Sequence, residues 1–119
     1  MIRVLVVDDN VDFRDVLVSL LEGQPDMEVV GTAGSLAEAH TMLEGVDVAL
    51  LDRGLPDGDG LKLIGTLRAA NPGARVFVIS TTAEVIHPTD ATEAGADGVI
   101  DKFDTLELVF ASIRGPGGG

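Results

Sequence analysis

Three aspartates follow two apolar segments of the sequence, and their spacing gives the first indication of chemistry. Asp8 and Asp9 follow residues 2–7, and Asp52 follows residues 46–51. Two carboxylates about 5 Å apart repel by roughly 3 kcal/mol at an effective dielectric constant of about 20. A fold that brings all three together would raise their pKa values or recruit a cation. A set of oxygen ligands without His or Cys suits Mg²⁺.

A hydroxyl and a lysine follow two further apolar segments. Ser80 comes directly after residues 75–79, and Lys102 follows shortly after residues 99–100. A hydroxyl can donate a hydrogen bond to a phosphoryl oxygen, and an ammonium group supplies positive charge. With the carboxylates nearby, these residues indicate nucleophilic attack by Asp52 on phosphorus. A single aspartate at a strand end is more often only part of a turn, so the prediction depends on these residues meeting.

The elements that would bring these residues together alternate between strands and helices. Residues 46–51 are almost continuously apolar, which is typical of a strand covered on both faces in a parallel sheet. The glycines and the proline that follow Asp52 predict a loop. The expected strands are residues 2–7, 27–30, 46–51, 75–79 and 99–100.

Five helices are expected after these strands. Asn10 is a suitable N-cap for the first, whose apolar face comprises Phe13, Val16, Leu17, Leu20 and Leu21. Ser35 and Glu38 have the spacing of a capping box, which predicts a second helix with Gly45 just past its end. The remaining expected helices are one carried by Leu61, Ile64 and Leu67 and ended by residues 71–73, a short one over residues 88–94, and a last one over residues 105–114.

The strict alternation of strands and helices predicts an α/β fold. We expect a flavodoxin-like, doubly wound, five-stranded parallel sheet with strand order 2-1-3-4-5 and five helices. In this order the four strands that precede Asp8, Asp52, Ser80 and Lys102 are consecutive, about 4.8 Å apart. Ligands bind such sheets outside the carboxyl ends of the strands, where the strand order reverses. The candidate residues are therefore expected at one edge of the sheet.

Composition limits the possible classes of protein. The chain has 119 residues, with 20 acidic against 8 basic side chains and a net charge of −12. One domain is expected, and it lacks the basic surface that direct nucleic acid binding requires. The absence of cysteine excludes disulfides and thiolate metal sites and fits a reducing, cytoplasmic location. No uninterrupted apolar run is long enough for a membrane span, and no signal peptide is evident.

Four motifs resemble the receiver domain of two-component response regulators, in the family's order and spacing. They are Val-Leu-Val-Val-Asp-Asp-Asn (residues 4–10), Leu-Leu-Asp-Arg-Gly-Leu-Pro-Asp-Gly-Asp-Gly (50–60), Val-Ile-Ser (78–80) and Gly-Ala-Asp-Gly-Val-Ile-Asp-Lys (95–102). Each motif alone is weak, whereas their combination is specific. The resemblance covers residues 1–114 and leaves residues 115–119 as a flexible Gly/Pro tail or linker.

This resemblance implies a phospho-accepting signalling switch. It implies that Asp52 accepts the phosphoryl group and that Ser80 and Lys102 contact it. It further implies that Mg²⁺ is bound by Asp8, Asp9, Asp52 and the backbone carbonyl of Gly54. The implied partners are a sensor histidine kinase or phosphotransfer protein, and an output domain or separate target. Such a domain is not an enzyme acting on other substrates, because it catalyses only its own phosphorylation and dephosphorylation.

Three positions depart from the family pattern. Arg53 stands where an aliphatic residue usually follows the phosphoacceptor, and Val99 stands where an aromatic residue commonly reports the switch. Phe103 follows Lys102 where many relatives have proline. These departures leave open a second function, that of a receiver-like interaction module that works without phosphorylation.

Two other kinds of site fail on spacing. The segment 57–60, Asp-Gly-Asp-Gly, resembles part of a calcium loop, but the twelfth position would be Thr66, which cannot supply bidentate ligation. A phosphohydrolase with an aspartate nucleophile would need a second aspartate two residues after Asp52, where Gly54 stands.

Overall fold

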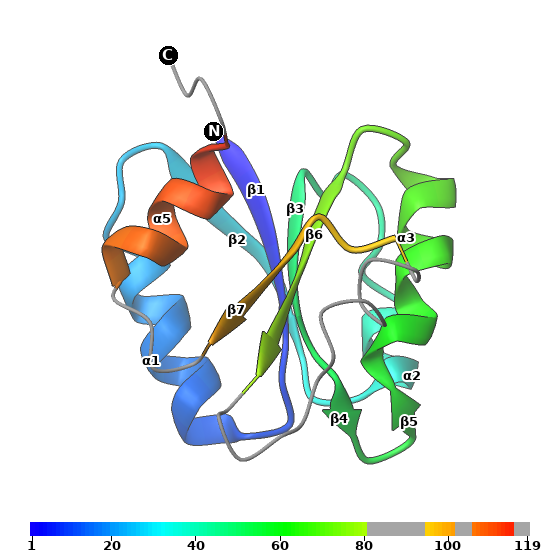
Figure 1. Ribbon diagram of the computed structural model, residues 1–119. Coiled ribbons are helices and arrows are strands. Elements are labelled where there is room, and N and C mark those ends of the chain that lie inside the picture. Colours follow the sequence, from blue (N-terminus) through cyan, green and yellow to red (C-terminus); the bar gives the residue numbers. More distant parts are fainter. Residues whose placement is uncertain (81–94, 102–105, 116–119) are drawn as a thin grey trace.

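The computed structural model describes residues 1–80, 95–101 and 106–115, which form a parallel sheet with helices on both faces (Figure 1). The strand order is β2-β1-β3-β6-β7, and each neighbouring pair is parallel. Since β6 and β7 are the fourth and fifth strands of this sheet along the chain, the predicted order 2-1-3-4-5 is confirmed. The strands are β1 (Ile2–Val7), β2 (Met27–Ala33), β3 (Val48–Asp52), β6 (Arg75–Ser80) and β7 (Gly98–Asp101).

Strand β3 lies at the centre of the sheet. All five of its residues are buried, including Asp52. It pairs with β1 on one side and with β6 on the other. A strand this apolar is stable in such a place because helices cover both of its faces. The central position of β3 puts Asp52 in the middle of the edge formed by the carboxyl ends of the strands.

Helices α1 (Val11–Glu22) and α5 (Leu106–Arg114) cover one face of the sheet (Figure 1). Successive strand residues point to opposite faces, so alternate residues of each strand pack against these helices. The buried core on this face includes Val4, Val6, Leu17, Leu21, Val48, Leu50, Val109 and Ile113.

Helices α2 (Leu36–Ala39) and α3 (Leu63–Ala70) cover the other face, and a 3₁₀ turn, η1 (Gly60–Lys62), leads into α3 (Figure 1). The strand residues that alternate with the first set pack here. The buried core on this face includes Leu5, Val7, Ala39, Ala49, Leu51, Leu63, Ile64 and Leu67.

Helix α2 is shorter than predicted. Its start is as expected, since the Ser35 hydroxyl accepts a hydrogen bond of 3.1 Å from the Glu38 N–H. The α-helix nevertheless ends at Ala39, well before Gly45. The N–H and the hydroxyl of Thr41 both donate to the Glu38 carbonyl, at 3.0 and 2.7 Å. These bonds to the residue three positions back tighten the chain and end the α-helical pattern.

The buried face of α1 differs from the prediction at Val16 and Leu20. Asn10 caps the helix as expected, accepting a 3.0 Å hydrogen bond from the Phe13 N–H. Leu17 and Leu21 are buried, but Val16 is 59% exposed and Leu20 is only partly buried. The part of α1 that meets the sheet is therefore narrower than the predicted apolar stripe.

Several element boundaries also differ from those predicted. Strand β2 continues to Ala33 and β3 begins at Val48. A short antiparallel hairpin of β4 (Gly54–Leu55) and β5 (Gly58–Asp59) lies within the expected loop after Asp52. The helix expected at residues 88–94 lies outside the described residues, as does Phe103.

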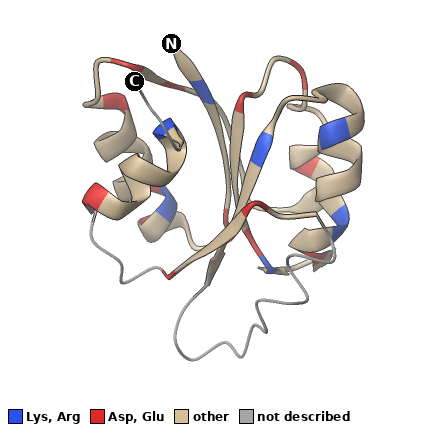
Figure 2. Ribbon diagram, turned by 45° about the horizontal axis from the view of Figure 1, so that its top comes forward, with Lys and Arg blue, Asp and Glu red and all other residues tan. Residues whose placement is uncertain are grey.

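Two further properties bear on the expected partners. Lys and Arg positions in the described part of the chain are spread over the sheet and both helical layers instead of lining one element (Figure 2). Each helix in that part of the chain is too short or too polar to cross a lipid bilayer.

Candidate functional site: an acidic cluster at the carboxyl edge of the sheet

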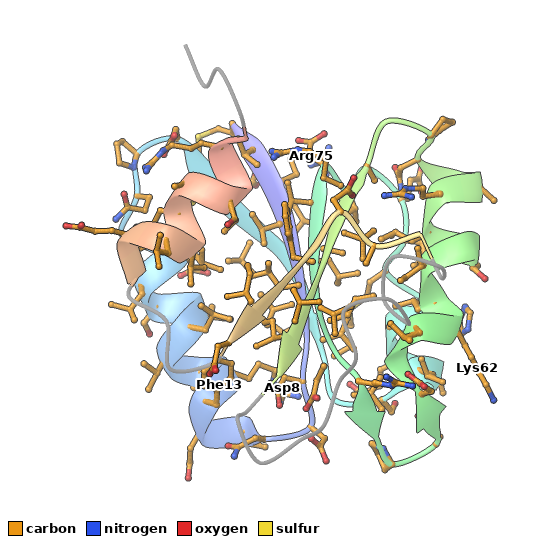
Figure 3. All side chains as sticks on the ribbon, viewed as in Figure 1. Asp8, Phe13, Lys62 and Arg75 are labelled. Carbon is orange, nitrogen blue, oxygen red and sulfur yellow. The ribbon has the colours of Figure 1, made fainter. Side chains whose placement is uncertain are left out.

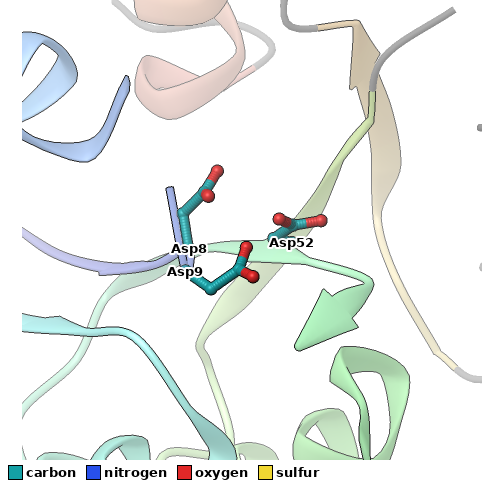
Figure 4. A group of neighbouring side chains, drawn as sticks. All are labelled: Asp8, Asp9 and Asp52. Carbon is teal, nitrogen blue, oxygen red and sulfur yellow. The ribbon is translucent and has the colours of Figure 1, made fainter. Parts of the chain in front are cut away.

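The structure brings Asp8, Asp9 and Asp52 together at the carboxyl edge of the sheet (Figure 4). One carboxylate oxygen from each lies within 4.8 Å of the other two. Asp8 and Asp52 are buried, at 0% and 3% exposure, whereas Asp9 is exposed. The predicted meeting of these three carboxylates is confirmed, and one side of the cluster is open to solvent through Asp9.

A sharp turn at the end of β1 places Asp8 and Asp9 on the same side. Consecutive residues of a continuous strand would point in opposite directions. Strand β1 ends at Val7, however, and Asp9 forms a bend. The Asp8 Oδ1 atom accepts a 2.8 Å hydrogen bond from the Asn10 N–H, which closes a turn typical of Asp. This turn leads directly into α1 and lets both carboxylates face Asp52.

Asp52 is held by the chain that follows it. Its Oδ1 atom accepts a 3.1 Å hydrogen bond from the Gly54 N–H. Gly60 packs so closely on this segment that a Cβ atom there would overlap the Asp52 carbonyl oxygen. The Gly60 N–H also donates to the Arg53 carbonyl at 2.9 Å. The glycines after Asp52 thus allow the β4–β5 hairpin to fold back against the end of β3.

The two other aspartates of this hairpin bind elsewhere. Asp57 accepts hydrogen bonds from the N–H groups of Leu36 and Ala37 at 2.8 and 3.0 Å, across a separation of about 20 residues. These bonds, the one from Leu36 foremost, hold the pKa of the Asp57 carboxyl below its ordinary value. The hairpin is thereby attached to the N-terminus of α2.

Asp59 has a different partner. Its Oδ2 atom lies 3.0 Å from Nε of Arg53, and its Oδ1 atom accepts a 3.0 Å hydrogen bond from the Leu61 N–H at the start of η1. Asp57 and Asp59 therefore do not point into a common ion site, which agrees with the rejection of a calcium loop.

Ser80 and Lys102 are placed only in part. Ser80 ends β6, where it pairs with Asp101, the last residue of β7. Its backbone lies one position beyond Ile79, the partner of Asp52 in the ladder. The Ser80 side chain and the whole of Lys102 lie outside the described residues. Their contact with a phosphoryl group stays a prediction.

Sequence reasoning missed the contacts that hold the cluster from outside. Asp57 binds a helix in a different part of the chain, and Arg14 donates from Nη1 to the Asp8 carbonyl at 3.1 Å. Neither contact belongs to a local motif. An arginine in the first turns of a helix that directly follows two aspartates was the only available signal.

The donor set fits a hard divalent cation. The described side chains of the cluster offer carboxylate oxygens and no nitrogen or sulfur, which is the chemistry that Mg²⁺ prefers. Figure 3 shows Asp8 at the carboxyl end of the central strands, with Arg75 at the opposite end of the sheet. The cation would therefore bind at the edge where the strand order reverses, the usual ligand site of an open α/β sheet.

Comparison with known proteins agrees with this architecture. The family model of the response regulator receiver domain matches residues 4–114. The chain belongs to this family. As a receiver domain it is a signalling module, and its acidic cluster corresponds to the pocket expected at the carboxyl edge.

Individual relatives share the fold closely. The chain is 39% identical to the DNA-binding transcriptional activator DevR/DosR of Mycobacterium tuberculosis, over 100% of this chain and 56% of that protein. The receiver domain of the response regulator NarL from the same species has 31% identity and a TM-score of 0.81, covering 97% of this chain and 98% of that one. This receiver domain thus spans little more than half the length of its DevR/DosR relative.

A third relative was solved in a modified state. It is a response regulator from Burkholderia pseudomallei with a phosphorylated aspartic acid, a calcium ion and citrate. It has 27% identity to this receiver domain and a TM-score of 0.81, covering 95% of this chain and 66% of that one.

Proposed function

We propose that this receiver domain is a switch that accepts a phosphoryl group on Asp52. The observation that supports this proposal most directly is the buried Asp52 carboxylate at the end of the central strand. One of its oxygens lies within 4.8 Å of a carboxylate oxygen of Asp8 and of Asp9. Asp52 is the member of the cluster at the centre of the edge, and it has neighbouring strands on both sides. A sensor histidine kinase or a phosphotransfer protein would be the donor.

The proposed step is a displacement at phosphorus. An Asp52 carboxylate oxygen attacks the phosphorus atom of a phosphohistidine, so a P–O bond forms while the P–N bond breaks. The electron pair of the broken bond stays on the imidazole nitrogen. The Gly54 N–H, bonded to Asp52 Oδ1, orients the carboxylate for this attack. Ser80 and Lys102 would contact the transferred group, and water would later hydrolyse the acyl phosphate.

A divalent cation fits this step. Asp8, Asp9, Asp52 and the Gly54 carbonyl would hold Mg²⁺, which when bound neutralises negative charge on the carboxylates and the phosphoryl oxygens. Support comes from the oxygen-only donor set and from the relative that holds both a phosphorylated aspartic acid and a calcium ion. Without a cation, an incoming phosphoryl group would meet three neighbouring carboxylates.

The output would be exerted through another domain or protein. The DevR/DosR relative is a DNA-binding activator nearly twice as long as the aligned region. We therefore propose that phosphorylation changes how this domain contacts an output domain joined through residues 115–119, or a separate target. The −12 charge argues against direct binding of nucleic acid by the receiver domain itself.

A second candidate is an interaction module that does not need phosphorylation. It is favoured by Val99, whose side chain is 37% exposed on β7 and is too small to act as the family's aromatic reporter. Arg53 also forms an ion pair with Asp59 beside the phosphoacceptor. In this case the acidic cluster would serve only to bind a stabilising cation.

Phosphoryl transfer distinguishes the two candidates. The protein is incubated with acetyl phosphate or phosphoramidate, with Mg²⁺ or with EDTA, and its intact mass is measured. We expect a labile phosphate adduct on the wild type in Mg²⁺ only, and none on Asp52→Asn. An adduct of equal yield on Asp52→Asn would refute the assignment of Asp52. No adduct on the wild type, while Mg²⁺ still raises its melting temperature, would favour the second candidate.

A further inference from the structure

Arg14 of α1 reaches the backbone of the acidic cluster. Its Nη1 atom donates a 3.1 Å hydrogen bond to the carbonyl oxygen of Asp8. The guanidinium group passes beside Gly34, the residue directly after β2, which is the strand next to β1. A Cβ atom on Gly34 would lie 2.8 Å from Nη1 of Arg14 and 3.9 Å from the Asp8 carbonyl oxygen. The absence of a side chain at residue 34 therefore provides the space that the guanidinium group occupies.

The carbonyl that Arg14 binds belongs to the peptide between Asp8 and Asp9. The orientation of this peptide decides how the two carboxylates lie relative to each other, because the chain leaves strand geometry at this point. The preceding N–H, that of Asp8, donates to the Ala33 carbonyl at 2.9 Å, and Asp8 Oδ1 accepts from the Asn10 N–H at 2.8 Å. The Arg14 contact adds a hydrogen bond on the carbonyl side of the turn.

We infer that Arg14 is a positioning residue for the divalent cation site and that Gly34 leaves the space that its guanidinium group needs. The inference rests on the cation site of the proposed function and extends it to two residues outside the cluster. Arg14 does not touch the cation. It fixes the peptide from which two of the three carboxylates project, so that Asp8 and Asp9 meet Asp52 without first having to reorganise.

The direction in which Mg²⁺ affinity changes when Arg14 is replaced distinguishes a positioning role from a purely electrostatic one. A guanidinium group near a divalent cation repels it, so removing the charge alone would tighten Mg²⁺ binding. Removing a group that orients metal ligands weakens binding instead, typically by about 10-fold or more. Arg14→Met removes the donor and keeps most of the aliphatic stem. We expect it to weaken Mg²⁺ binding about 10-fold.

Gly34→Ala tests the role of this space while leaving Arg14 itself unchanged. The added methyl group lies ordinarily close to the Asp8 carbonyl but too close to Nη1, so it displaces only the guanidinium group. The backbone of Gly34 is not in the left-handed region, so alanine introduces no backbone strain there. We expect weaker Mg²⁺ binding than in the wild type, and no additional loss when Gly34→Ala is combined with Arg14→Met.

The experiment is a double-mutant cycle read by isothermal titration calorimetry with MgCl₂. The proteins are the wild type, Arg14→Met, Gly34→Ala, the double variant, and Lys62→Met as a control. Lys62 extends into solvent beside α3, so its removal changes the net charge equally without contacting the cluster (Figure 3). Melting of each apo protein establishes that it is folded, and Arg14→Leu, which also removes the donor and the charge, replaces Arg14→Met if the latter does not fold.

Weaker binding in both single variants, an unchanged Lys62→Met and a double variant no weaker than Arg14→Met would support the inference. Tighter or unchanged binding in Arg14→Met, or additive losses in the double variant, would overturn it. In those cases the wild type still binds Mg²⁺ and the proposed function stands. A wild type that binds no Mg²⁺ would overturn the cation site itself.

Discussion

Replacing Asp9 by asparagine should stabilise the protein without Mg²⁺ and nearly abolish its stabilisation by Mg²⁺. Asparagine has almost the same shape as aspartate but carries no charge. The Asp9 oxygen lies within 4.8 Å of an oxygen of Asp8 and of Asp52. At that distance two unit charges repel by about 0.9 kcal/mol in water and by about 3.5 kcal/mol at an effective dielectric constant of about 20.

The lower value suits Asp9 because its side chain is exposed. Two repelling pairs at about 0.9 kcal/mol each give an expected gain of about 1–2 kcal/mol in the free energy of unfolding of the apo protein. For a domain of this size, this corresponds to roughly 3–8 °C in melting temperature. The same substitution removes one ligand charge, so binding of Mg²⁺ to the folded state should fall sharply.

Thermal unfolding in EDTA and in a series of Mg²⁺ concentrations measures both effects. A cation that binds only the folded state stabilises it by about 2.7 kcal/mol at 100 times its Kd. We expect the melting temperature of Asp9→Asn to lie above that of the wild type in EDTA and below it at saturating Mg²⁺. Asp15→Asn is the matched control, since Asp15 is exposed on α1 and is not part of the cluster.

The curve of melting temperature against Mg²⁺ concentration for Asp9→Asn should therefore cross the curve of the wild type. The curve for Asp15→Asn should run parallel to that of the wild type. If Asp9→Asn follows the wild type in EDTA and in Mg²⁺ alike, the three carboxylates neither repel one another appreciably nor share a cation. The electrostatic account of the site would then be wrong.

Three further predictions follow from contacts around the site. Asp57→Asn should have a lower free energy of unfolding than the wild type near pH 7. Because the pKa of Asp57 is lower in the folded than in the unfolded protein, its carboxylate stabilises the fold at pH values above the unfolded pKa, and this stabilisation is lost as the carboxylate is protonated. Chemical denaturation should therefore show the deficit of the variant shrinking below about pH 4. Equal differences at pH 7 and pH 3 would contradict this. Gly60→Ala should lower the free energy of unfolding by about 1–3 kcal/mol, measured by urea denaturation, because its methyl group overlaps the Asp52 carbonyl, whereas Gly65→Ala, at a helical position with open space, should not. A beryllofluoride adduct should shift amide NMR signals near Asp9, Asp52 and Ser80 but few on β7 and α5, because Val99 is stiff at χ1 and partly exposed. Large shifts across Val99 and α5 would show that the readout does not need an aromatic residue there.

The sequence allowed the sheet and the acidic cluster to be predicted because both depend on patterns along the chain. The apolar run before Asp52 could be stable only as a buried central strand, and β3 is buried at all five positions. Strand order then followed from short right-handed connections. Once the order was known, the carboxyl ends of β1 and β3 had to be neighbours, which placed Asp8 beside Asp52.

The errors arose where local patterns compete with hydrogen bonds or packing that the sequence does not display. The apolar spacing of α2 continued to Leu43, but Thr41 bonded back to Glu38 and ended the helix. The stripe on α1 included Val16, which the sheet leaves exposed. In both cases the apolar periodicity predicted the correct helix, but it did not predict where α2 ends or which residues of α1 are buried.

The long-range polar contacts could not have been predicted in the same way. Asp57 to α2 and Arg14 to the Asp8 carbonyl each join groups that become neighbours only after the sheet has formed. These contacts attach the acidic cluster to both helical layers. Arg14 comes from α1 on one face, while the β4–β5 hairpin after Asp52 is bonded to α2 on the other. Hydrogen bonds therefore connect Asp52, through Gly54 and the hairpin that carries Asp57, to the N-terminus of α2, and Val99 is not part of this connection.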